Sequence, residues 1–188
     1  MDLCASLDKL QHLTALYMVS IRPVEPLPVN SLSSPPQYLQ CLYLKSSLPS
    51  IPEWVLSLQN LSKLVLQYCN LDHDPLRTLQ RLPNLILLEL REAYAGEELC
   101  CNAGGYPKLR KLGLKGRGQV KRIRIDEGAM SGLRELNISS CRELETLPLG
   151  IEHLRNLQQL DLPWDFYLRQ SGSEDFWRVQ HVSTVQAF

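Results

Sequence analysis

The chain has 188 residues, a length that suits a single domain. Its 20 Lys and Arg residues balance 20 Asp and Glu residues, so the overall charge does not predict a nucleic-acid-binding protein. With 21% charged and 44% hydrophobic residues, and no window of 18 apolar residues, neither a disordered chain nor a membrane span is predicted.

The first residues do not form a recognisable targeting signal. Asp2, Asp8 and Lys9 interrupt the first apolar stretch, so a secretory signal is not predicted. We therefore expect a cytoplasmic protein whose six cysteines are thiols. No two cysteines form a CxxC pair, and no metal site is expected from them.

A repeated leucine motif runs along the chain. Leucine is by far the most frequent residue, and an LxxLxL pattern, ending in Met or Ile in two copies, begins at Leu13, Leu39, Leu61, Leu85, Leu109, Leu133 and Leu157. The intervals between these starting positions are nearly constant, and every one of them falls within the range typical of leucine-rich repeats. The pattern predicts an α/β leucine-rich-repeat solenoid of about seven repeats over residues 1–162.

Each LxxLxL motif predicts a short strand. Alternate side chains of a strand point to opposite faces, so Leu64 and Leu66 are expected to face inward. One strand cannot bury its leucines alone, whereas stacked parallel strands share a core. Because the rest of each unit is bulkier than a strand, we expect the parallel sheet on the concave side. Cys69 and Cys141 occupy the Asn/Cys position of their repeats and are expected to be buried.

The segments between the motifs predict an irregular or short-helical convex side. Residues 22–38 contain five prolines and are expected to form a loop within the solenoid. Asp74 and Pro75 predict the N-cap and first turn of a short helix. Ile123 and Ile125 alternate with charged residues, which predicts an extended convex segment.

Residues 163–188 follow the last motif and carry several large aromatic side chains, among them Trp164, Phe166 and Trp177. The last unit of a solenoid exposes core leucines unless something covers them. We therefore expect residues 163–188 to form a C-terminal cap.

No motif for catalysis is present. The sequence has no GxxxxGK[ST] phosphate loop, no GxSxG and no HExxH, and its four histidines are far apart in sequence. We expect no catalytic residue, no cofactor and no metal. The interpretation is a non-enzymatic protein that binds other proteins.

Candidate protein-binding residues are those at or beside the outward positions of the predicted strands. Their mixture of Tyr, Arg and Trp suits binding hot spots, although a solvated surface is the alternative for any one of them. They are Tyr17, Tyr43, Lys45, Lys63, Gln67, Tyr68, Glu89, Arg91, Glu92, Arg110, Lys111, Lys115, Arg134, Glu135, Asn137, Gln159, Asp161 and Trp164.

A cluster of basic residues interrupts the neutral average. No acidic residue occurs between Cys100 and Ile125, while this stretch holds Lys108, Arg110, Lys111, Lys115, Arg117, Lys121, Arg122 and Arg124. Because a solenoid keeps sequence neighbours close, we expect a basic band that could dock an acidic protein surface; a solvated surface is the alternative.

Some segments of the chain are more distinctive than the generic LxxLxL motif. Examples are SLQNLSKLVL at 57–66, IDEGAM at 125–130 and LETLPLGIEHLRNLQQL at 144–160. On these segments the chain resembles the C-terminal leucine-rich-repeat region of plant intracellular immune receptors, which also carry a coiled coil and a nucleotide-binding domain. The chain contains neither of those two parts, so nucleotide switching is not carried over.

The resemblance implies a protein-binding module in plant defence, in effector perception or receptor autoinhibition. The partner it implies is a pathogen effector, a host guardee, or a nucleotide-binding domain in cis or in trans. The alternative is a general intracellular leucine-rich-repeat scaffold in signalling.

Overall fold

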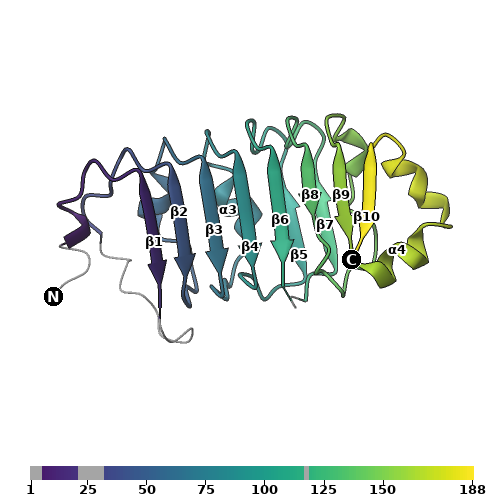
Figure 1. The fold of residues 1–188 in the computed structure, drawn as a ribbon, viewed down its shortest axis with the longest axis horizontal. Helices are drawn as coiled ribbons and strands as arrows, with labels where there is room; N and C mark the ends of the chain where they lie inside the picture. Colours follow the sequence, from purple (N-terminus) through teal and green to yellow (C-terminus); the bar gives the residue numbers. More distant parts are fainter. Residues whose placement is uncertain (1–5, 21–31, 117–118) are drawn as a thin grey trace.

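The computed structural model describes residues 6–20, 32–116 and 119–188. Within these ranges eight strands form one parallel sheet in the order β1-β2-β3-β4-β6-β8-β9-β10 (Figure 1). The strands are β1 (Ala15–Val19), β2 (Cys41–Lys45), β3 (Lys63–Gln67), β4 (Leu87–Arg91), β6 (Lys111–Lys115), β8 (Glu135–Asn137), β9 (Gln159–Leu162) and β10 (Thr184–Ala187). All but β10 coincide with an LxxLxL motif, and together they form a leucine-rich-repeat solenoid.

The core is a stack of leucines held in register by the sheet. Leu64 of β3 pairs with Leu88 of β4, which pairs with Leu112 of β6, and all three side chains are buried. Cys69 and Cys141 are buried in the same cluster, as predicted. The inward leucines therefore form continuous rows from unit to unit, and each unit depends on its neighbours for burial.

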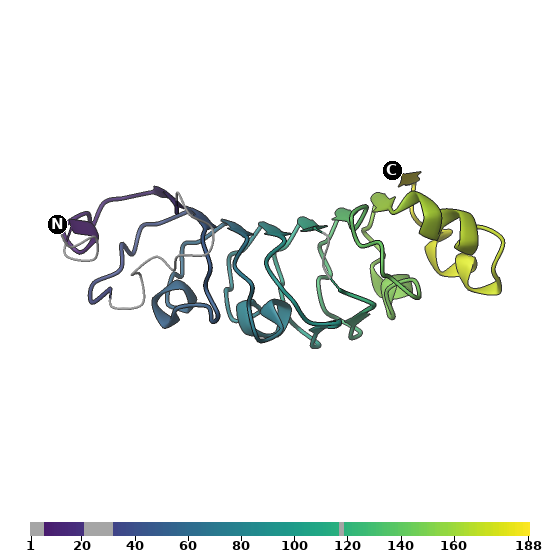
Figure 2. The same ribbon diagram turned by 90° about the horizontal axis from the view of Figure 1, so that it is seen from below.

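The opposite side of the arc carries short helices and a second sheet (Figure 2). The helices are α2 (Glu53–Leu56), α3 (Pro75–Leu79) and the 3-10 turn η1 (Ile151–His153). Asp74 caps α3 by accepting a hydrogen bond from the Leu76 backbone N–H at 2.8 Å, as its sequence predicts. In the second sheet β5 (Glu98–Cys101) pairs in parallel with β7 (Arg122–Ile125), the predicted extended segment.

Hydrogen bonds tie each unit to the one before it. The side-chain amides of Asn60, Asn84 and Asn156 donate to backbone carbonyls of preceding units, at 2.7 to 2.9 Å. The buried hydroxyl of Tyr106 donates to the Leu76 carbonyl at 2.8 Å, and burial raises its pKa well above the ordinary value. These contacts fix the relative rotation of neighbouring units and so keep the exposed face in a defined shape.

The C-terminal segment adds a turn of solenoid that the sequence analysis did not predict. After α4 (Trp164–Gln170) and the 3-10 helix η2 (Glu174–Val179), β10 pairs in parallel with β9. Phe166 and Val179 are buried against the core cluster. The Arg178 guanidinium holds the Glu152 carboxylate of η1 at 2.8 Å. That the segment caps the solenoid remains a proposal.

Most of the expected proline-rich loop at 22–38 lies outside the described residues. Among the residues that are described, no helix is long and apolar enough to cross a membrane.

Candidate functional site

The exposed face of the eight-stranded sheet lies on the concave side of a gentle arc (Figure 2). Parallel register aligns its outward side chains into rows across the strands. A middle row runs through Tyr17, Tyr43, Val65, Glu89, Gly113, Asn137 and Asp161. A second row, at the strand ends, runs through Val19, Lys45, Gln67, Arg91 and Lys115. The face is therefore a regular array of side chains on a stiff backbone.

The structure places the predicted binding residues in four settings. Most lie within the strands of the face: Tyr17, Tyr43, Lys45, Lys63, Gln67, Glu89, Arg91, Lys111, Lys115, Glu135, Asn137, Gln159 and Asp161. Arg110 and Arg134 precede their strands at its edge, whereas Trp164 begins α4. Tyr68 and Glu92 follow their strands in a left-handed backbone conformation, with φ of 56° and 47°, where the chain turns away from the sheet.

The expectation for Asp161 needs a correction. Asp161 is only 6% exposed, and the neighbouring side chains of Asn137 and Gln159 donate hydrogen bonds to its carboxylate. The Asn137 amide donates to one carboxylate oxygen at 2.7 Å and the Gln159 amide to the other at 2.9 Å. Asp161 therefore orients Asn137 and Gln159 and is itself not an exposed position of the face.

The N-terminal part of the face is aromatic. The Tyr17 and Tyr43 rings stack with centroids 5.9 Å apart, and the Tyr43 hydroxyl donates to the Gln67 side-chain oxygen at 2.5 Å. The Lys45 ammonium lies 5.5 Å from the centre of the Tyr68 ring, a cation–π distance. Tyr17 is 64% exposed, so this stack presents apolar area that a partner could cover.

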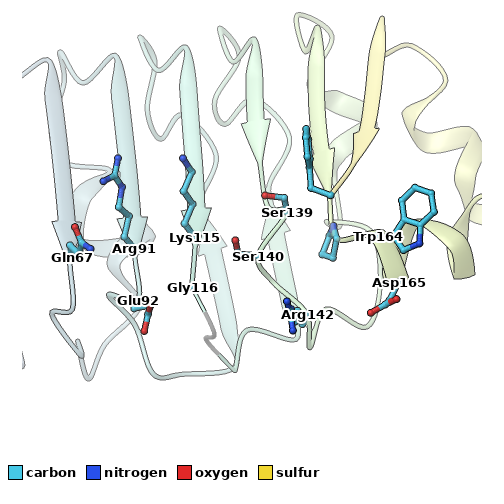
Figure 3. Close-up of a pocket in the computed structure, with 12 residues that line it drawn as sticks. Gln67, Arg91, Glu92, Lys115, Gly116, Ser139, Ser140, Arg142, Trp164 and Asp165 are labelled. Carbon is cyan, nitrogen blue, oxygen red and sulfur yellow. The ribbon is translucent and has the colours of Figure 1, made fainter.

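The C-terminal part of the face is polar and opens into a hollow of about 790 Å³ (Figure 3). Five of the predicted residues line it: Gln67, Arg91, Glu92, Lys115 and Trp164. Figure 3 shows Lys115 extending along β6, between Arg91 on one side and Ser139 and Trp164 on the other. The hollow therefore collects residues from several units, which the sequence pattern had placed only in separate repeats.

Sequence analysis missed other residues that line the hollow, notably Ser139, Ser140, Arg142 and Phe188. Ser139 holds the same position in its repeat that Lys115 holds in the preceding one, so the register alone could have found it. Phe188 carried no such signal because it follows β10, whose repeat was not recognised.

The basic cluster does not form the expected continuous band. Lys111 pairs with Glu135 at 2.7 Å on the concave face. On the convex side Lys121 pairs with Glu97 at 2.7 Å and Arg122 with Glu145 at 3.4 Å. Arg124 also pairs with Asp126 at 3.4 Å, and Arg117 lies outside the described residues. The expected band is thus divided between two faces, and four of its seven described cations are paired with acids, three of them from neighbouring units.

Three of the described cysteine thiols are buried in the core of the solenoid. Burial raises the pKa values of Cys69, Cys101 and Cys141 to about 12, which keeps them as unreactive thiols. Across the described ranges, no group of three or more His, Cys, Asp or Glu residues is placed to hold a metal ion.

Comparison with known proteins agrees with this architecture. The family model described as "Leucine-rich repeat region" matches residues 1–183. The disease resistance protein RPM1 of Arabidopsis thaliana is 34% identical over 192 residues, which cover 100% of this chain and 20% of that protein. Disease resistance RPP8-like protein 3 of the same plant is 32% identical, over 80% of this chain and 17% of the relative. The susceptibility protein LOV1 is 33% identical over 79% of the chain and 17% of its own length. The chain thus spans about a fifth of the length of these relatives.

Proposed function

Because this chain belongs to the family of leucine-rich-repeat regions found in plant disease resistance proteins, we propose that it is a protein-binding module of plant defence. In this proposal it acts in the cytoplasm and without catalysis. It serves either to perceive a pathogen effector or to keep a receptor autoinhibited. Its partner is then an effector, a host protein under surveillance, or a nucleotide-binding domain.

The observation that carries this proposal is the exposed array on the concave sheet. Fully buried leucines fix the backbone beneath it, so side chains such as Tyr43 and Arg91 are held in place before a partner arrives. A preorganised surface loses less conformational entropy on binding than a mobile one.

The composition of the array supports protein recognition over recognition of a small molecule. Tyr, Trp and Arg are the residues that most often contribute large binding energies at protein interfaces. Here Tyr17 and Tyr43 stand at one end of the face, Arg91 near its middle and Trp164 at the other end. A partner that spans these residues must be macromolecular, because they come from separate repeats.

A binding experiment with matched variants tests the proposal. The double variant Tyr17→Ala, Tyr43→Ala removes the stacked pair on the concave face. The control is His12→Ala, Tyr38→Ala, which removes a second stacked pair, 5.8 Å between centroids, outside the strands. Purified chain is measured against purified effectors and against nucleotide-binding domains of the disease resistance family.

We expect the concave variant to weaken binding at least about tenfold and the control to leave it unchanged, since a hot-spot residue contributes about 2 kcal/mol or more. Equal effects of the two variants would contradict binding through the concave face. Binding only to unrelated signalling proteins would favour a general scaffold.

A further inference from the structure

The hollow on the concave face exists because β8 is short. β8 spans Glu135–Asn137, whereas the neighbouring β6 spans five residues. The Ser139 backbone N–H and hydroxyl both donate to the Asn137 side-chain oxygen, at 3.3 and 2.9 Å, which turns the chain away after β8. The small side chains of Ser139 and Ser140 then leave the space beside Lys115 unfilled.

Gly116 lines the same opening. It follows β6 with φ of +152°, and an added Cβ would lie 2.7 Å from the backbone nitrogen of Glu92. A larger residue at this position would therefore displace backbone. The absence of a side chain here lets the end of β6 lie close against the Glu92 backbone at the wall of the hollow.

Two cations in the hollow differ from other cations of this protein in their surroundings. Lys111 pairs with Glu135, and Arg91 donates to Glu89 at 2.7 Å. In contrast, no acidic side chain of the described residues lies within ion-pair distance of Lys115 or Arg142. Their charges are available to an incoming anion.

The wall opposite Lys115 is apolar. Trp164 and Phe188 are 53% and 68% exposed, and the Trp164 backbone N–H donates to the Phe188 carbonyl at 2.8 Å. This bond holds the two aromatic residues beside each other at the edge of the hollow. Large exposed aromatics on a fixed backbone are typical of surfaces that bind an apolar side chain.

Two acids also line the hollow and restrict which anion fits. Glu92 and Asp165 lie along its lower edge in Figure 3, with no cation of the described residues in ion-pair contact. They repel a dense, doubly charged phosphate more than a single carboxylate. The nearby aromatic wall adds a preference for an apolar group beside the carboxylate.

From these features we infer that the hollow binds a segment of a partner protein in which a Glu or Asp is followed within one or two residues by a large apolar side chain. The carboxylate binds the Lys115 ammonium, the Arg142 guanidinium at the lower edge adds a second unpaired positive charge to the hollow, and the apolar side chain packs on Trp164 and Phe188. This inference rests on the proposed function, because it specifies the chemistry of the partner at one part of the concave face.

The test uses short peptides as probes and the Trp164 indole as a reporter. One peptide carries Glu-Phe flanked by Gly and Ser, with both ends blocked. Matched peptides carry Gln-Phe or Glu-Ser, and inorganic phosphate is titrated separately. The indole N–H of Trp164, assigned by its loss in Trp164→Phe, is followed by two-dimensional NMR at low and high salt.

We expect the Glu-Phe peptide to shift this resonance in a saturable way, with about tenfold tighter binding than the Gln-Phe peptide, the order expected for one charge-assisted hydrogen bond. The double variant Lys115→Gln, Arg142→Gln should abolish that preference. Lys9→Gln, Arg81→Gln removes two exposed charges outside the strands of the concave sheet and should retain it. High salt should weaken binding of Glu-Phe more than of Gln-Phe.

Several results would overturn the inference. Equal affinities for the Glu-Phe and Gln-Phe peptides would remove the role of the carboxylate, and equal affinities for Glu-Phe and Glu-Ser would remove the aromatic wall. Phosphate that binds more tightly than the peptide would make the hollow a phosphate site. If these tests fail while Tyr17→Ala, Tyr43→Ala still weakens partner binding, the proposed function stands and only the hollow is refuted.

Discussion

Replacing one core leucine should test the repeat register directly. Leu88 is fully buried, and the sheet pairs it with Leu64 on one side and Leu112 on the other. Leu88→Ala leaves a cavity that these flanking strands cannot collapse to fill, because their own register is fixed by parallel hydrogen bonds. We expect a loss of about 3–5 kcal/mol, the upper part of the range for buried leucine truncations.

The adjacent residue supplies the control. Glu89 points to the concave face, where its carboxylate meets the Arg91 guanidinium in a partly exposed pair. Such pairs contribute about 1 kcal/mol or less, so Glu89→Ala should have a small effect. Urea unfolding followed by circular dichroism measures both variants against wild type. Similar shifts of the midpoint at Leu88 and Glu89 would refute the assignment of inward and outward faces.

Three further predictions concern other parts of the molecule. Phe166→Ala should lower the free energy of unfolding by about 3–5 kcal/mol, since this fully buried ring anchors the C-terminal segment; a loss below about 1 kcal/mol would mean that the segment contributes little. Burial raises the pKa of Glu152, but hydrogen bonds from the backbone and from Arg178 outweigh the effect of burial and hold that pKa below 4.5. The stabilisation from the Glu152–Arg178 pair is therefore complete above about pH 4.5 and is lost as the pH falls through the lower pKa of the folded state. Glu152→Gln should therefore make the urea midpoint fall less steeply on acidification than in wild type. Iodoacetamide should label the partly exposed Cys41 before Cys141, whose pKa is raised to about 12; peptide mapping by mass spectrometry measures the order, and earlier labelling of Cys141 would contradict the prediction.

The sequence was sufficient for seven of the eight strands of the large sheet because one spacing rule determines them. A leucine at each inward position of a strand must meet the equivalent leucine one repeat away, so the LxxLxL motif specifies both strand and register. The motif did not predict β10 because residues smaller than leucine occupy the inward positions of this strand. Val182, Val185 and Ala187 have the LxxLxL spacing without a leucine, and they begin one repeat length after Leu157.

The hollow was harder to predict than the rows that lead into it. Register places Gln67, Arg91 and Lys115 in one row, and the structure confirms that placement. The early end of β8 depends on hydrogen bonds within one turn, and the position of Phe188 depends on an unrecognised strand. Neither follows from a periodic pattern, because both are departures from it.

The prediction of a continuous basic band was wrong for a related reason. A run of basic residues without acids looks unbalanced along the sequence, yet Lys111 and Arg122 find acidic partners in the next repeat. In a solenoid the nearest charges in space are about one repeat apart in sequence. Counting charges within a segment therefore overestimates the field at its surface.

The pairing of charges between units also bears on how such a protein can change over evolution. Lys111 and Glu135 lie one repeat apart, as do Glu97 and Lys121, so a mutation that reverses one charge creates a repulsion that a second, compensating mutation must relieve. Lys115 and Arg142 have no acidic ion-pair partner among the described residues, so a mutation of either needs no compensating mutation. Lys115 and Arg142 can thus mutate one at a time without leaving an unpaired acid, and new recognition specificities become accessible by single steps.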